Sequence, residues 1–227
     1  MRDRAIVALM IGDEIAELGK LTLPSLTAYA YRMKADLVLL CATVLTKQRP
    51  ELPAAYEKYQ LGELLLNYAR VVFFDLDIIV RPTCPDLFDA VPLGMMGAYV
   101  VSEHSNLHTP AMLRWLKAHD LDKKWDRRYF NSGVMVLDHG ARKLFDLGLG
   151  HCPGGAEFGD QTQLNVNRVL LDAPLFDIGY RFNHTSVPDI PKTDSHVLHF
   201  VGGAVADKIR RVRAFNKCNG VKECALV

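Results

Sequence analysis

Two acidic residues, Asp75 and Asp77, lie inside the apolar segment VVFFDLDIIV, which spans residues 71–80. An unpaired carboxylate is among the most costly groups to bury, so buried carboxylates are normally paired, protonated or bound to a metal. Two carboxylates one residue apart, where a strand turns, can both face one hard cation. The segment therefore indicates a chemical site rather than ordinary core.

Three interpretations of this pair are open. The aspartates can pair with arginines such as Arg70 or Arg81, they can belong to a phosphatase of the haloacid dehalogenase type with Asp75 as the nucleophile, or they can hold a divalent metal that binds a nucleotide diphosphate. In that type of phosphatase the Asp-x-Asp motif stands near the start of the chain, whereas here about seventy residues precede it. The segment GDQTQL also lacks the second acidic residue that such a phosphatase needs. The order of the segments favours the metal.

The periodicity of apolar residues predicts the elements that position the pair. A continuous apolar run predicts a buried strand at residues 4–11, and apolar residues three and four apart predict a helix at 12–35. A strand at 36–42, a helix at 56–67 and the strand 71–80 follow. Alternating strands and helices indicate an α/β domain with a mainly parallel sheet covered on both faces. In such sheets ligands collect at the carboxyl ends of the strands, where Asp75 and Asp77 are expected to lie.

The remainder of the chain continues the alternation without an internal repeat or a low-complexity linker, so residues 1–227 are expected to form one domain. We predict strands at 95–102, 129–138, 173–178 and 196–201, helices at 140–147, 160–171 and 206–215, and a glycine-rich break at 150–159.

Composition and charge exclude several classes of function. A formal net charge of +1, without a basic stripe interleaved with aromatic residues, argues against nucleic-acid binding. No apolar run reaches the about 20 residues of a membrane span, and the first residues do not form a secretory signal. The five cysteines are an odd number without CxxC spacing, which favours a reducing compartment. We therefore expect a soluble, cytoplasmic protein.

Four stretches together resemble a known family: KYQLGELLLNYARVVFFDLDIIVRPTCPDLFD, YFNSGVMVLD, GDQTQLN and HVLHFVGG. In this order and spacing they are similar to glycosyltransferases of the GT-A fold, most of all the retaining family eight group that includes glycogenin and the lipopolysaccharide galactosyltransferases. The Asp-x-Asp motif alone is a weak signal, but the combination is specific. The resemblance implies a single GT-A domain, with a nucleotide-binding half at 1–80 and a half for the donor sugar and acceptor at 81–227.

The resemblance also implies a role for individual residues. Asp75, Asp77 and His199 would hold Mn²⁺ or Mg²⁺ against the diphosphate, a ligand set that suits such cations. Asp160 and Gln161 would lie beside the anomeric carbon as the catalytic pair. Donor-binding roles would fall to Asn131, Ser132, Lys58, Asp13, Gly202 and Lys208.

Structural explanations compete with several of these roles. Asp160 can simply cap a helix, Asn131 can be a turn residue, and Lys58 can be a solvated helix lysine. The family typically has HFxGxxKPW, whereas HFVGGAVADK puts a valine at the place of that lysine and delays the lysine to Lys208. Either Lys208, or Arg210 or Arg211 beyond it, contacts the diphosphate, or the contact is lost.

The expected activity is therefore metal-dependent transfer of a hexosyl group, with retention, from a nucleotide-sugar to a sugar or glycan acceptor. By family resemblance UDP is the expected nucleotide, and attack by the acceptor from the side of the leaving group is the favoured route. The two alternatives are the phosphatase and a non-catalytic module that binds a nucleotide-sugar.

Overall fold

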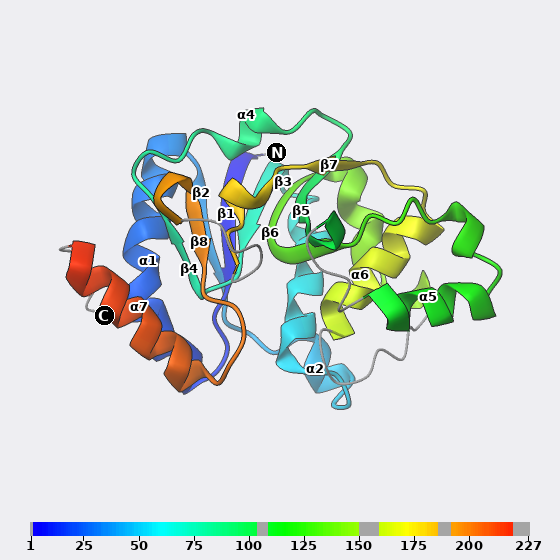
Figure 1. Cartoon of the computed structure of the whole chain (residues 1–227), viewed down its shortest axis with the longest axis horizontal. Coiled ribbons are helices and arrows are strands. Elements are labelled where there is room, and N and C mark those ends of the chain that lie inside the picture. Colours follow the sequence, from blue (N-terminus) through cyan, green and yellow to red (C-terminus); the bar gives the residue numbers. More distant parts are fainter. Residues whose placement is uncertain (1, 104–108, 150–158, 186–191, 220–227) are drawn as a thin grey trace.

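A six-stranded mixed sheet forms the centre of the molecule, with helices on both sides (Figure 1). The computed structural model describes residues 2–103, 109–149, 159–185 and 192–219, so most of the glycine-rich break predicted at 150–159 lies outside the described residues. The central sheet has the order β2-β1-β3-β6-β5-β7, and a separate two-stranded sheet pairs β4 with β8. The strands are β1 (Arg2–Leu9), β2 (Asp36–Leu40), β3 (Tyr68–Phe74), β4 (Ile78–Val80), β5 (Met96–Val100), β6 (Phe130–Asp138), β7 (Leu175–Asp177) and β8 (Val197–His199).

Parallel pairing dominates the N-terminal side of the sheet, because β1 pairs in parallel with both β2 and β3. β6 runs antiparallel to β3 and β5, while β7 is parallel to β5. The predicted α/β architecture is confirmed. Residues 5–9 of β1 and 71–74 of β3 are continuous apolar runs, which are typical of strands with helices on both faces.

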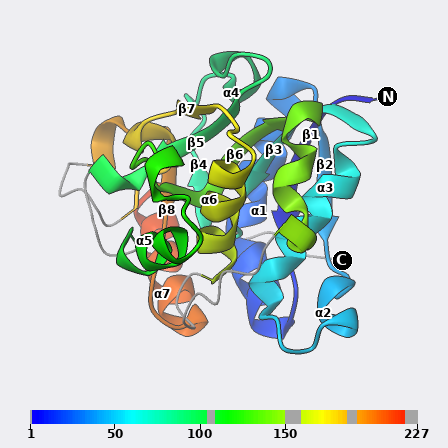
Figure 2. The same ribbon diagram turned by 90° about the vertical axis from the view of Figure 1, so that its right-hand side faces the viewer.

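The helices are α1 (Asp13–Met33), α2 (Leu45–Gln48), α3 (Leu61–Leu64), α4 (Leu87–Ala90), α5 (Thr109–Ala118), α6 (Gly159–Leu170) and α7 (Val205–Asn219). Turns of 3₁₀ helix occupy Ala54–Gln60, Val101–Glu103, Asp122–Lys124, His139–Phe145, Leu147–Leu149, Tyr180–Phe182 and Lys192–Asp194. α7 lies beside α1 on one flank, and α5 and α6 lie on the opposite flank (Figures 1 and 2). None of the described helices combines the length and the apolar character that crossing a membrane requires.

Side chains of alternate strand residues fill two separate cores. Ile6, Val72 and Phe74 pack on one face with residues of α1, and Val7, Val71 and Phe73 pack on the other with α3 and the 3₁₀ turns. This alternation follows from the period of two along a strand. A third, smaller cluster joins α1 and α7 to β4 and β8. Both faces of β3 are therefore buried as far as Phe74, the residue before Asp75.

Three predicted elements differ from those observed. The strand predicted at 71–80 is two strands in different sheets, since β3 ends at Phe74 and β4 begins at Ile78. The helix predicted at 56–67 is a 3₁₀ turn followed by the four-residue α3, and the helix predicted at 140–147 is also 3₁₀. Among the described cysteines, Cys41, Cys84 and Cys218 are free thiols.

Candidate active site

The turn from Asp75 to Asp77 connects the two sheets. The backbone N–H of Asp75 donates to the carbonyl oxygen of Gly133 in β6 at 2.8 Å, and that of Phe200 donates to the carbonyl oxygen of Asp77 at 2.9 Å. The Leu76 side chain is buried in the core that also contains Ile6 and Phe74. The carboxylates on either side of Leu76 line a cavity of about 300 Å³, to which Leu76 also contributes.

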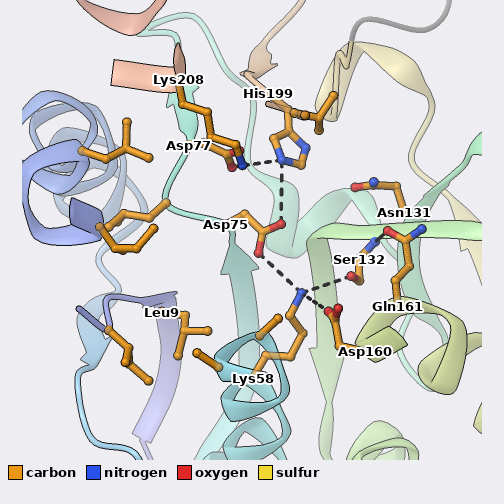
Figure 3. A pocket seen from close by; sticks show the side chains of 18 residues that line it. Leu9, Lys58, Asp75, Asp77, Asn131, Ser132, Asp160, Gln161, His199 and Lys208 are labelled. Atoms are coloured by element: carbon orange, nitrogen blue, oxygen red, sulfur yellow. Dashed lines mark hydrogen bonds and ion pairs between the residues drawn. The ribbon is translucent and has the colours of Figure 1, made fainter. Parts of the chain in front are cut away.

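Asp75, Asp77 and His199 converge at this cavity (Figure 3). His199 Nε2 lies 3.0 Å from Asp77 Oδ1 and 3.7 Å from Asp75 Oδ2. β8 brings His199 to this place, because His199 pairs with Ile78, the residue that follows Asp77. The three predicted ligands, two of which lie more than 120 residues from the third in the chain, are therefore brought together.

These atoms suit a divalent cation. Neighbouring ligands of an octahedral ion with bonds of roughly 2.1 Å are about 3 Å apart, which is close to the observed separation of His199 Nε2 and Asp77 Oδ1. Two carboxylate oxygens and one imidazole nitrogen are a donor set that Mn²⁺ accepts. A group of this kind occurs nowhere else among the described residues.

Lys58 is the buried cation of the site and lies on the side of Asp75 away from His199 (Figure 3). Its ammonium is 2.7 Å from Asp160 Oδ2, 3.5 Å from Asp75 Oδ1 and 3.2 Å from Ser132 Oγ, and only 4% of its side chain is exposed. Lys58 is thus not a solvated helix lysine. It connects the Asp75 carboxylate to the Asp160 end of the cavity.

Lys208, in the first part of α7, reaches the opposite side of the cluster. Its ammonium donates to Asp77 Oδ2 at 2.6 Å. Arg210 instead pairs with Asp207, and Arg211 donates to the carbonyl oxygens of Phe200 and Gly202. Of the three basic residues proposed from the sequence, only Lys208 lines the cavity.

The surrounding charges move the pKa values of the two aspartates in opposite directions. Burial opposes ionisation of Asp77, but the neighbouring His199 and Lys208 outweigh it and hold the pKa of that carboxyl below its usual range. Burial raises the pKa of Asp75 despite Lys58, and the charge of Asp77 adds to this effect. Burial disfavours the charged form of Lys58, yet Asp160 and Asp75 raise its pKa and keep it an ammonium.

An interruption in β6 positions the residues expected to face the sugar. The β5–β6 register shifts between Ala98, which pairs with Met135, and Tyr99, which pairs with Asn131. The residues in between leave the β5–β6 ladder, and the backbone N–H of Ser132 donates instead to Oε1 of Gln161 in α6 at 3.0 Å. Such bulges often re-aim side chains at active sites. Asn131 and Ser132 consequently line the cavity together with Asp160 and Gln161.

The other end of the cavity is apolar. Leu9, Ile11, Ile15, Leu18, Ala54 and Ala55 contribute to its lining. Gly202 is part of the wall beside His199, in the left-handed region with φ 73°. Asp13 is exposed in the first turn of α1 and does not line the cavity, although its neighbours Ile11 and Ile15 do.

The sequence analysis did not single out Asn183. This residue is fully buried, and its side chain contacts both His199 Nδ1, at 2.7 Å, and Asn131 Oδ1, at 2.8 Å. In the segment YRFNHTS it looks like an ordinary loop asparagine. Only the pairing of residue 184 with β8 brings it beside the cluster.

Gly133→Ala is expected to weaken binding of Mn²⁺ by the isolated protein by about 10- to 100-fold, the range for loss of a ligand's support. A Cβ atom at Gly133 would lie 2.2 Å from His199 Cε1 and 2.8 Å from Nδ1, so the imidazole has to move away from the aspartates. Calorimetric titration measures the affinity. Gly140→Ala, two residues after the end of β6, is the matched control, since a Cβ atom there would lie 3.1 Å from its nearest neighbour. Equal affinities for the two variants would contradict the assignment of His199 as a ligand.

Comparisons with known proteins agree with the geometry. The model of glycosyl transferase family 8 matches residues 13–143. A comparison with curated proteins gave no match. The fold is similar to that of the galactosyltransferase LgtC in complex with donor and acceptor sugar analogues, with a TM-score of 0.64, 17% identity and 95% of each chain covered.

Two further solved structures are similar. The apo form of mouse xyloside xylosyltransferase 1 has a TM-score of 0.57 and 12% identity, with 87% of this chain and 97% of that chain covered. The glycosyltransferase GlyE of Streptococcus pneumoniae TIGR4 has a TM-score of 0.58 and 14% identity, with 100% of this chain and 67% of that chain covered. At these identities the similarity concerns the fold.

Proposed function

Since the chain belongs to glycosyl transferase family 8, we propose that it moves a hexosyl group from a nucleotide-sugar, with UDP as the nucleotide, to a carbohydrate acceptor. The proposal includes a divalent metal, retention at the anomeric carbon, and a division into a nucleotide half at 1–80 and a half for the sugars at 81–227. The observation that carries it is the convergence of Asp75, Asp77 and His199 in one cavity with Lys58 and Asp160. Membership of this family argues against the alternative of a haloacid dehalogenase-type phosphatase.

The diphosphate of the donor is proposed to lie between the metal ligands and Lys208. Mn²⁺ or Mg²⁺ held by Asp75, Asp77 and His199 would act as a Lewis acid toward the departing nucleoside diphosphate. Lys208 supplies a second positive charge, because its ammonium already lies within the cavity against Asp77. Gly202 allows the chain after β8 to approach closely, since it has no side chain and adopts a positive φ.

The transferred sugar is proposed to lie against Asn131, Ser132, Asp160 and Gln161. Asp160 Oδ2 is engaged by the Lys58 ammonium at 2.7 Å, which lowers the nucleophilicity of that oxygen. We therefore favour attack by the acceptor from the leaving-group side, with Asp160 balancing positive charge at the anomeric carbon. Gln161 uses Oε1 to hold Ser132, so its Nε2 group, 3.3 Å from Tyr129 Oη, is the part left to donate to a sugar hydroxyl.

The apolar end of the cavity is proposed to take the base. Leu9, Ile11 and Ile15 offer apolar contact there. The role of Asp13 in base binding stays a prediction, and it requires the exposed first turn of α1 to face the bound nucleotide.

A donor-hydrolysis assay tests the proposed function. The protein is incubated with Mn²⁺ and a panel of UDP- and GDP-sugars, and free nucleoside diphosphate is measured. We expect slow release that is largest for one UDP-sugar, that stops when EDTA removes the metal, and that returns with added Mn²⁺. Proton NMR of the anomeric centre of the released sugar, recorded before mutarotation, measures retention.

Two results would overturn parts of the proposal. Binding of nucleotide-sugars without any release, with or without carbohydrate acceptors, would favour the non-catalytic module. Release that is unchanged in EDTA would remove the metal from the mechanism.

A further inference from the structure

The side chain of Asn183 joins the two functional ends of the cavity. One end of its amide lies 2.7 Å from His199 Nδ1, and the other end lies 2.8 Å from Asn131 Oδ1. His199 is a candidate metal ligand, and Asn131 is a candidate for the donor sugar. Asn183 itself is fully buried, so it contacts neither the metal nor the sugar.

One backbone group determines the direction of the hydrogen bonds that connect Asn131, Asn183 and His199. The N–H of Gly133 lies 2.9 Å from the side chain of Asn131, and a backbone N–H can only donate. The Asn131 atom that it contacts is therefore the carbonyl oxygen. Since that oxygen can only accept, the Asn183 atom facing it has to be the amino group.

The same logic determines which nitrogen of His199 carries a hydrogen. With its amino group directed to Asn131, Asn183 presents its carbonyl oxygen to His199 Nδ1. Nδ1 must then be the donor, because the oxygen has no hydrogen to give. In the neutral imidazole this leaves the lone pair on Nε2, the nitrogen directed at Asp75 and Asp77.

We propose that Asn183 is a positioning residue: it keeps the hydrogen of His199 on Nδ1 so that Nε2 is free to bind the cation, and it fixes the amide of Asn131. The amino group of Asn131, which makes no hydrogen bond to the described residues, is thereby kept available for a sugar hydroxyl. This inference rests on the proposed function for its metal and its sugar.

The two substitutions Asn183→Leu and Asn183→Asp separate these tasks. Leucine removes both contacts, so we expect Mn²⁺ binding in the absence of nucleotide to weaken about 10- to 100-fold, the usual range for loss of a ligand's hydrogen-bonding partner. Aspartate keeps an acceptor for Nδ1 but no donor for Asn131. We expect it to bind Mn²⁺ within a few-fold of the wild type and to release nucleoside diphosphate at least about tenfold more slowly. Thr185→Val, a substitution of another buried polar residue two positions away, is the control for both measurements.

Nitrogen-15 NMR of labelled histidine provides a readout that does not depend on activity. In the metal-free protein and in the protein loaded with diamagnetic Mg²⁺, we expect His199 Nδ1 to carry a slowly exchanging hydrogen. In Asn183→Leu this hydrogen is expected to exchange rapidly or to move to Nε2. Where Asn183→Leu does not fold, the wild-type spectrum and Asn183→Asp still decide the question.

Two results would overturn the inference: a wild-type His199 without a hydrogen on Nδ1, or a folded Asn183→Leu variant that binds Mn²⁺ as tightly as the wild type. A different result would contradict the proposed function alone. A wild-type protein that binds no Mn²⁺ but has the hydrogen on Nδ1 would contradict the metal site and leave the positioning by Asn183 intact.

Discussion

Asp77→Asn is expected to lower the rate of metal-dependent release of nucleoside diphosphate about 1000-fold. The substitution keeps the shape of the side chain but removes the charge that faces both His199 Nε2 and the Lys208 ammonium. Stabilisation of developing charge by a metal is worth several kcal/mol, and about 4 kcal/mol corresponds to a factor of 1000. The rate is measured with saturating UDP-sugar across a range of Mn²⁺ concentrations.

Asp207→Asn is the matched control for this substitution. Asp207 also pairs with a basic residue of α7, but its partner Arg210 is exposed and lies outside the cavity lining. We expect the activity of this variant to stay within about twofold of the wild type, since exposed pairs contribute little. Activity of Asp77→Asn close to that of Asp207→Asn would contradict a metal site at the Asp-x-Asp turn.

Lys58→Met is expected to lower the free energy of unfolding by about 3 kcal/mol, because removing one member of a buried ion pair leaves a charge without compensation. Here the loss affects two carboxylates, those of Asp160 and Asp75, together with the hydroxyl of Ser132. Some water can reach Asp75 from the cavity, so the lower end of the usual range applies. Urea denaturation measures the change.

Two further variants test the physical reason. Lys20→Met removes an exposed lysine that pairs with Glu17, and we expect a change of at most about 1 kcal/mol. The double variant Lys58→Met/Asp160→Asn is expected to recover part of the stability, because it removes one of the two charges that the first substitution left without Lys58. A double variant that is less stable than Lys58→Met would mean that Lys58 stabilises the fold through packing rather than through charge.

The sequence predicted the architecture, and the structure gathers the candidate site residues chosen from it, apart from Asp13, in one cavity. Runs of apolar residues indicate β1, β2 and β3, since strands covered on both faces have near-continuous apolar runs. The spacing of the four family-like segments led to His199, which no periodicity would have connected with Asp75. The roles of these residues in binding and catalysis stay predictions.

Other features depend on contacts between distant segments. The boundary between β3 and β4 was missed because Ile78–Val80 is as apolar as Val71–Phe74, although it packs in a different sheet. Lys58 could not be placed from sequence, because its burial depends on Asp160, about one hundred residues later. Asn183 was missed for the same reason, since its neighbours in the chain give no sign of His199 and Asn131.

The short ladder between β4 and β8 makes the proposed metal site depend on strand register. Ile79 and Leu198 pack in the cluster with α1 and α7, whereas Ile78 and Val197 pack in the main core. A slip of one residue would send these side chains to the wrong cores and would turn Leu198, in place of His199, toward the aspartates. The two apolar clusters therefore set the register that brings a histidine, rather than a leucine, to the proposed metal site, although neither cluster contains a proposed metal ligand.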